Sequence, residues 1–422
     1  MYALVDCNNF FVSCERVFNP NLCKKPVVVL SSNDGCVIAR SNEVKEMGIP
    51  MGAPAYKYKE LFEKEGIIAL SCNHALYHDM SQRVMALLSE RVGEIQIYSV
   101  DEAFFKIDET DIILIQKFAS ELVQYIERCT GISISIGVSY TRTLSKIASH
   151  IAKKGRTNSP KSYILYSPDE IHKRLKVLPV RDVWGIGHQI NLALAKINVY
   201  TAFEFSRLPR LWVKKHFTIV GERTWLELHG LESCEIQSVT AERKSLTVSR
   251  IFGNKVTDKT QLKEATSTLV SQCAVKLRKE NKMVKAITIF ISTSRFNEND
   301  SYYSNSSFCR LQYCTNSTME LVKLACELLD RIYRDGYAYK RAGVLLSELG
   351  SADSYQYELF NEIDEAKHQK LMSAIDQINN MGLKSKVFLC AEGTDKKIWM
   401  PKSLHSSKHF STSIKDSIIV KA

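Results

Sequence analysis

Short runs of apolar residues, separated by polar turns, predict a sheet in the first third of the chain. The segments YALVD (2–6), KPVVVLSS (25–32) and ISISIGVSY (132–140) predict strands, because β-branched and aromatic residues dominate them. EIQIYSV (94–100) and AFFKID (103–108) predict two more strands, joined tightly at Asp101 and Glu102. Turn residues such as the NDGC that follows Ser32 separate these runs.

Helical periodicity alternates with these strands. It predicts helices over VIARSNEVKEMGI, which would end at Gly48, and over the pattern from Leu76 to Val92. Two further helices are predicted over IILIQKFASELVQYIERCTG (112–131) and LSKIASHIAKKG (144–155), the second of which carries Lys146, Lys153 and Lys154. Strands and helices in this order predict an α+β or α/β core.

The pattern changes twice further along the chain. After about residue 170 it predicts short helices, with Gly185-Ile186-Gly187 between two of them. A β-rich region then runs from Arg243 to Glu348, and the remaining residues are rich in serine and lysine, with one apolar motif, QYELF (356–360). With 422 residues, we expect roughly three or four domains.

Composition narrows the class of protein. No run of 18 apolar residues occurs, which argues against a membrane span, and MYALVDCNNFF lacks the basic start of a signal peptide. The twelve cysteines form no C-x-x-C pair, so we expect reduced thiols in a cytoplasmic protein and no zinc site. A net charge of +11 favours a polyanionic partner, and nucleic acid fits better than a membrane surface.

The adjacent acids Asp101 and Glu102 lie at the predicted hairpin tip, where both side chains can turn toward one point. Asp6, at the end of the first strand, joins them if the two strands are neighbours. Converging carboxylates need cations, and their hard oxygens suit Mg²⁺. Two such ions about 4 Å apart would assist an in-line displacement at phosphorus. The alternative is an acidic turn exposed to solvent.

The motifs favour the first reading. SVDEAFF (99–105) and DCNNFF (6–11), with VVVLSSNDGCVIARSNEVKEMGIPMG (27–52) and VWGIG (183–187), resemble the Y-family of translesion DNA polymerases, and within it the UmuC-type branch. The resemblance covers nearly the whole chain. It implies an α+β multidomain fold shaped like a right hand: palm (1–20 and 75–168), fingers (21–74), a thumb with a helix-hairpin-helix (169–238), an α+β little finger (243–350) and a C-terminal clamp- and partner-binding tail (351–422).

The resemblance also implies roles for single residues. Asp6, Asp101 and Glu102 match the catalytic acids that bind two Mg²⁺ ions, and Phe11 matches the steric gate that excludes ribonucleotides, while Phe10 is expected to pack in the core. The residues expected to contact the triphosphate of the incoming deoxynucleotide are Arg40, Lys45 and Lys153. The sequence departs from many relatives at Asn42, where tyrosine is common, and at Lys45, where arginine is common.

Other motifs point to DNA and protein partners. Gly185, Ile186 and Gly187 match a helix-hairpin-helix that holds the phosphate backbone of primer-template DNA without reading its bases. Gln356, Leu359 and Phe360 resemble the peptide that docks in the sliding clamp, although Tyr357 stands where leucine is frequent. In the UmuC-type branch, the tail binds the processed UmuD dimer and, through the assembly, RecA.

The acids are compatible with two other functions. A two-metal nuclease or nucleotidyl cyclase could use the same acids, but a nuclease needs no steric gate and a cyclase needs no clamp peptide. A non-catalytic DNA-binding scaffold has no reason to keep three acids together. We therefore predict an error-prone DNA polymerase of the SOS response to DNA damage, cytoplasmic and associated with the nucleoid.

Overall fold

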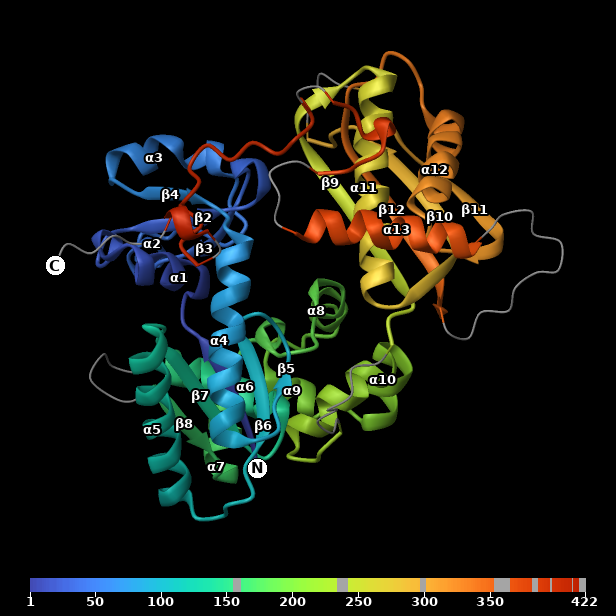
Figure 1. Cartoon of the computed structure of the whole chain (residues 1–422). Coiled ribbons are helices and arrows are strands. Elements are labelled where there is room, and N and C mark those ends of the chain that lie inside the picture. The colour runs from blue at the N-terminus through green and yellow to red at the C-terminus, as the bar shows by residue number, and fades with distance from the viewer. Residues whose placement is uncertain are drawn as a thin grey trace. The chain divides into compact units, whose positions relative to one another are not determined.

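The computed structural model describes residues 1–154, 161–233, 242–296, 301–352, 365–381, 386–394, 397–411 and 413–416. The chain divides into two units, each with cores of its own (Figure 1). Unit 1 contains Met1–Ser31, Gly35–Thr240 and His405–Ala422. Unit 2 contains Ser32–Asp34 and Ala241–Leu404.

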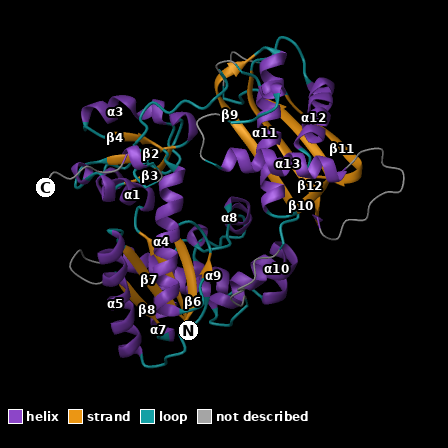
Figure 2. Ribbon diagram, viewed as in Figure 1, coloured by secondary structure: helices purple, strands orange, loops and turns teal. Residues whose placement is uncertain are grey.

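A five-stranded sheet organises unit 1, with its strands in the order β5-β6-β1-β7-β8 (Figure 2 labels β6, β7 and β8). The bounds of the strands are β1 (Tyr2–Cys7), β5 (Gln96–Ile97), β6 (Glu102–Lys106), β7 (Ile134–Ser139) and β8 (Ser162–Leu165). The central strand β1 is antiparallel to both neighbours and buried along its whole length. The predicted strands at 2–6, 103–108 and 132–140 are confirmed, whereas the strand predicted over 94–100 is limited to Gln96–Ile97, and Glu102 belongs to β6 and not to the turn before it.

The two faces of β1 meet different helices. Ala3, Val5 and Cys7 pack in a core with α4 (His74–Val92) and α5 (Ile112–Thr130), both of which the sequence predicted. Leu4 and Asp6 line a hollow on the face that carries α6 (Arg142–Lys154). This division follows from the period of two along a strand, and it sends the side chain of Asp6 toward α6.

Gly137 of β7 lets α6 lie close to the sheet. A Cβ atom at this position would lie 2.0 Å from the backbone nitrogen of Ser149. The hydroxyl of Ser145 also donates a hydrogen bond to the carbonyl of Tyr2, at 2.7 Å, which joins α6 to β1. These contacts fix the helix that carries Lys146 and Lys153.

A second, three-stranded sheet of unit 1 corrects one prediction. Its order is β3-β2-β4, with β2 (Val27–Leu30), β3 (Val37–Arg40) and β4 (Ile68–Ser71). The helix predicted over 37–49 is wrong in its first part, because Val37–Arg40 pairs with β2, and only α2 (Asn42–Glu46) is helical. Val37 and Val44 share one core, so strand pairing and burial outweighed the local helical pattern. The remaining helix of this region is α3 (Lys59–Lys64).

Short helices follow, as predicted, in the last part of unit 1. They are α7 (Pro168–Val177), α8 (His188–Ala195) and α9 (Ala202–Ser206), followed by the longer α10 (Arg210–Leu228), which is interrupted at Thr218. Ile186, Leu194 and Phe205 belong to their shared core, which also includes Leu144 and Ile147 of α6. The first helix of the chain, α1 (Phe10–Phe18), follows β1 directly.

Unit 2 is built on one antiparallel sheet in the order β11-β10-β12-β9. Its strands are β9 (Ser245–Val256), β10 (Lys282–Ser292), β11 (Ser304–Thr315) and β12 (Tyr339–Ser351), and its helices are α11 (Lys259–Lys279), α12 (Thr318–Ile332) and α13 (Glu365–Asn380). The helices α11 and α12 pack on the sheet (Figure 1). The β-rich region that the sequence predicted therefore also contains two long helices.

Residues near the C-terminus pack on the cores: Trp399 in unit 2 and Phe410 in unit 1. Trp399 is 1% exposed and packs on Phe252 of β9 in the core of unit 2. Phe410 stacks on Phe18 of α1 in unit 1. Serine and lysine dominate this region of the sequence, so its composition alone gave no sign of these contacts. No helix among the described residues is long and apolar enough to cross a membrane.

Candidate active site

Strand pairing brings two of the predicted acids together. In the register of β1 and β6, Asp6 lies directly opposite Glu102. Side chains of directly opposed residues point to the same face of a sheet. Both residues line one hollow of about 800 Å³ on the face of the sheet that carries α6.

Asp101 lies in the bend immediately before β6. Its carbonyl accepts a hydrogen bond from the Cys7 amide at 2.9 Å, and its carboxylate accepts one from the Ser99 hydroxyl at 2.5 Å. It does not line the hollow that Asp6 and Glu102 share. The structure thus brings all three acids to one end of β1, although only two face the same hollow.

Two lysines of α6 neutralise the acid pair. The Lys146 ammonium lies 2.9 Å from a carboxylate oxygen of Glu102, and the Lys153 ammonium forms an ion pair with Asp6. The two lysines are seven residues apart, which places them on one face of the helix. The sequence predicted Lys153 as a contact of the triphosphate but assigned no role to Lys146. The spacing of seven residues between the two lysines could have indicated that Lys146 lies on the same face of the helix.

Burial and charge act together on Asp6. Burial raises its pKa to about 7; Lys153 opposes this rise, and the negative charges of Glu102 and Asp101 add to it. The charged form of Asp6 therefore depends on a nearby cation.

The donor set fits a hard divalent cation. Carboxylate oxygens are the ligands that Mg²⁺ prefers, and the present partners of Asp6 and Glu102 are ammonium groups that an ion could replace. Among the described residues, no three acidic, histidine or cysteine side chains already stand close enough together to hold a metal ion. Asp6, Glu102 and Asp101 would thus have to reorient to bind one together.

The predicted phosphate-binding residues of the 37–49 region lie near the start of α1. The Lys45 ammonium donates a hydrogen bond to the side chain of Asn9, and Asn9 in turn donates one to Asn42 at 2.9 Å. Burial lowers the pKa of Lys45, and the positive charges of Lys153 and Arg40 lower it further. Lys45 therefore lies in a region of positive potential to which Lys153 and Arg40 contribute.

Part of the Arg40 guanidinium lacks a hydrogen-bond partner among the described residues. Its guanidinium donates to the carbonyl of Ile49 at 2.5 Å. Its Nε atom is buried and, within the described part of the chain, has no hydrogen-bond partner. An orphaned buried donor is costly, and a phosphate oxygen would satisfy it.

The two aromatic residues at the start of α1 differ in environment. Phe10 is buried in the core, as predicted. The ring of Phe11 is only partly buried and stacks on Tyr77 of α4, with 4.3 Å between ring centroids and 12° between planes. His74 meets the same ring edge-on at 6.3 Å. The position of the Phe11 ring is therefore fixed by packing on Tyr77 and His74. The ring does not line the hollow that contains Asp6 and Glu102.

The predicted helix-hairpin-helix has the backbone geometry of a tight turn. Gly185 has a φ of +92°, and an added Cβ would lie 2.5 Å from the hydroxyl of Thr224. Gly187 precedes the first residue of α8 and has open space around it. The Ile186 side chain is buried in the core, so this residue could contact a DNA phosphate only through its backbone.

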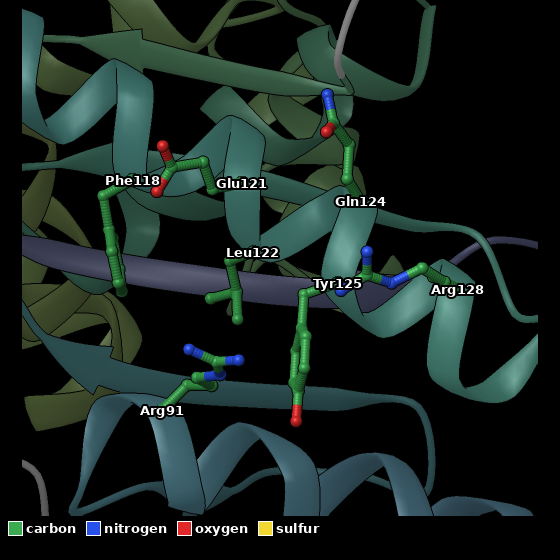
Figure 3. Close-up of a pocket in the computed structure, with 7 residues that line it drawn as sticks. All are labelled: Arg91, Phe118, Glu121, Leu122, Gln124, Tyr125 and Arg128. Atoms are coloured by element: carbon green, nitrogen blue, oxygen red, sulfur yellow. The ribbon is translucent and has the colours of Figure 1, made fainter.

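Other predicted or possible sites lie elsewhere. Gln356, Leu359 and Phe360 lie outside the described residues. A separate hollow contains Arg91 of α4 and six residues of α5, and the guanidinium of Arg91 lies 4.0 Å from the centroid of the Tyr125 ring (Figure 3). It contains none of the predicted site residues.

Sequence comparison gives matches along most of the chain. Residues 5–150 match the impB/mucB/samB family, residues 243–359 match its C-terminal domain, and residues 369–420 match a domain of unknown function. The chain is 37% identical to the protein UmuC of Salmonella typhimurium strain LT2, over all of both chains. It is 34% identical to the protein ImpB of Salmonella typhimurium, over 99% of this chain and 98% of the other. It is 26% identical to DNA polymerase IV of Clostridium acetobutylicum, over 89% of this chain and 93% of the other.

Solved structures share the fold. A chimera of Y-family DNA polymerases built from Dbh and Dpo4 superposes with a TM-score of 0.66 at 21% identity, covering 83% of this chain and 99% of the other. An insertion ternary complex of Dbh DNA polymerase gives a TM-score of 0.53 at 20% identity, with the same coverage.

Proposed function

Since the chain belongs to the impB/mucB/samB family of UmuC-type, Y-family translesion DNA polymerases, we propose that Asp6, Asp101 and Glu102 carry its nucleotidyl transfer. The observation that supports this assignment is the pairing of Asp6 opposite Glu102 beside two lysines of α6. The family depends on divalent metal ions, and we propose two Mg²⁺ ions here.

The reaction joins a primer to an incoming deoxynucleotide. The 3′-oxygen of the primer forms a bond to the α-phosphorus, and the bond from that phosphorus to pyrophosphate breaks. Bound Mg²⁺ would supply a Lewis acid for the attacking and leaving oxygens. The three carboxylates hold this charge in place, and the buried setting of Asp6 strengthens its attraction for a cation.

The cations of the site bind the triphosphate. Lys153 exchanges its ion pair with Asp6 for a phosphate oxygen, and Arg40 offers its buried Nε–H. Lys45 is held near them by Asn9. Its ammonium lacks the two-pronged geometry of arginine, so it acts as a point charge.

Phe11 serves as the sugar gate, by which we mean the ring that fills the space beneath the deoxyribose. A 2′-hydroxyl would collide with this ring, and ribonucleotides would be rejected by shape. The backbone around Gly187 and the start of α8 binds a phosphate of the duplex.

The remaining partners are proposed on the resemblance and on the relatives. The segment with Gln356, Leu359 and Phe360 binds the sliding clamp, and the C-terminal tail binds a processed UmuD dimer and RecA. A cytoplasmic location on nucleoid DNA remains a prediction.

The test is primer extension past an abasic site with Mg²⁺, in the presence of clamp, UmuD-like partner and RecA filament. We expect extension by the wild type and none by Asp6→Ala, Asp101→Ala or Glu102→Ala, each with near-normal duplex binding. Glu90→Ala, which removes an exposed carboxylate of α4, is the matched control and should extend normally. Extension by any of the three acid variants would remove that acid from the reaction.

A further inference from the structure

A buried carboxylate lies behind the sugar gate. Glu15 of α1 is 1% exposed. One of its oxygens, Oε1, accepts hydrogen bonds from two hydroxyls, that of Tyr77 at 2.8 Å and that of Ser407 at 3.0 Å. Burial raises the pKa of Glu15, and these two bonds lower it. Since buried polar groups are costly without partners, both hydroxyls matter to this arrangement.

Tyr77 connects the carboxylate to the gate. Its ring is 1% exposed and stacks on the ring of Phe11, while its hydroxyl is fixed by Glu15. Tyr77 therefore has a fixed position at both ends. A change that breaks the hydrogen bond of the Tyr77 hydroxyl would therefore allow the Tyr77 ring, on which Phe11 stacks, to move.

Ser407 reaches Glu15 because residues His405–Phe410, here called the C-terminal strap, lie against unit 1 (the red end of the chain beside α1 and β2 in Figure 1). The backbone of His405 exchanges hydrogen bonds with Ser71, at 2.9 and 3.0 Å. The amide of Asn73 donates to the Ser407 hydroxyl at 3.0 Å and to the Lys408 carbonyl at 3.1 Å. Phe410 stacks on Phe18, with 5.3 Å between centroids.

The strap also meets the start of the helix that carries Tyr77. The side chain of Asn73 accepts a hydrogen bond from the backbone of Leu76 and so caps α4. The strap thus holds Tyr77 twice, through Glu15 at its hydroxyl and through Asn73 at the first turn of its helix.

We propose that Ser407 is a positioning residue of the nucleotide site, through which the C-terminal strap sets the accuracy of sugar selection. The relay runs from Ser407 to Glu15, to Tyr77 and to Phe11. It gives part of the domain of unknown function at 369–420 a role in choosing deoxyribonucleotides. The inference rests on the proposed role of Phe11 as the gate.

The experiment measures single-nucleotide insertion by the full chain with its partners, as kcat/KM for a deoxynucleotide and for the matching ribonucleotide. Ser407→Ala should raise the ribonucleotide share on the order of threefold to tenfold, the loss expected for one hydrogen bond of ordinary strength. Ser407→Thr keeps the hydroxyl and should restore the wild-type ratio. Ser206→Ala removes a buried hydroxyl that donates to the Phe203 carbonyl, away from the gate, and should leave the ratio unchanged.

A double-mutant cycle tests the route. Tyr77→Phe keeps the stacked ring and loses only the bond to Glu15, so it should act like Ser407→Ala. The two changes together should have less than the sum of their separate effects, because both weaken one relay. Additive effects would contradict the relay. An equal loss of kcat/KM for both sugars in Ser407→Ala would show a structural role only and overturn the proposal.

Phe11→Ala separates this inference from its premise. If Phe11→Ala leaves sugar discrimination unchanged, the gate assignment itself fails. If Phe11→Ala admits ribonucleotides and Ser407→Ala does not, the gate stands and the strap has no part in it. Melting temperatures of all variants confirm that each is folded at the assay temperature.

Discussion

At the scale of single residues, nearby lysine ammonium groups offset the repulsion between the carboxylates of Asp6 and Glu102. Asp6 and Glu102 face each other across two strands, and each is bound to an ammonium group of α6. The acids themselves could be predicted from sequence because they stand at strand ends in recognisable motifs. Their lysine partners are 147 and 44 residues away, and no local pattern connects them.

Lys153→Ala is the sharpest test of this charge balance. The change removes the partner of a buried carboxylate and a proposed triphosphate contact, so kcat/KM for the deoxynucleotide should fall about 10- to 100-fold. Single-turnover insertion kinetics measure it. Lys173→Ala, which removes an exposed cation of α7, is the control and should have no effect. Normal insertion by Lys153→Ala would mean that its ion pair with Asp6 has no catalytic consequence.

At the scale of elements, local pattern and tertiary contact disagreed at 37–49. Four residues there extend a sheet with β2, and only Asn42–Glu46 form a helix. The long helices α4 and α5 and the central strands were predicted correctly, because their periodicity runs over many residues. A short segment gives too little periodicity to compete with pairing to a neighbouring strand.

The two glycines before α8 differ in a way that can be measured. Gly185→Ala should cost about 1 to 3 kcal/mol, because its φ is positive and the new Cβ would meet Thr224. Gly187→Ala has open space and should leave stability unchanged, but it should weaken binding to duplex DNA if a phosphate approaches the backbone there. Thermal melting and DNA titration of the two variants measure both effects. Equal stability of the two variants would contradict the strain assigned to Gly185.

The segment around Trp399 acts as an added piece of the unit 2 core. The Gly253 amide donates to the Trp399 carbonyl at 3.2 Å, and the ring is buried on Phe252. Trp399→Ala should destabilise unit 2 by about 3 to 5 kcal/mol. Hydrogen exchange resolved by peptide measures this, and faster exchange should appear in β9 and α11. Met400→Ala, at an exposed neighbour, should leave exchange unchanged.

At the scale of the whole molecule, a net charge of +11 suits a member of a DNA polymerase family, because attraction to the phosphate backbone does not depend on base sequence. The C-terminal residues contribute to both units: Trp399 to the core of unit 2, and the strap to unit 1. The family resemblance implied that this region is a tail that binds partners. The structure adds that single side chains of this region pack on the cores, Trp399 in unit 2 and Phe410 in unit 1.

Replacing Leu359 and Phe360 together with alanine tests the clamp assignment. Synthesis stimulated by the clamp should fall at least tenfold, because two apolar side chains that fill a pocket are lost, while synthesis without clamp should be unchanged. Extension assays with and without clamp measure it. Replacing Glu358 with alanine is the control within the same segment. An equal fall without clamp would make this segment structural.

The sequence by itself determined the family and the long elements, and it supplied the predictions of the acids and of the gate residue, because these depend on residue types at short, fixed spacings. Only the tertiary structure decided which cations neutralise the acids, that β3 is a strand, that Ile186 is buried and that Ser407 reaches Glu15. Each of these is a contact between residues far apart in the chain. Such contacts are selected by the burial and pairing of the folded whole, and no short stretch of sequence records them.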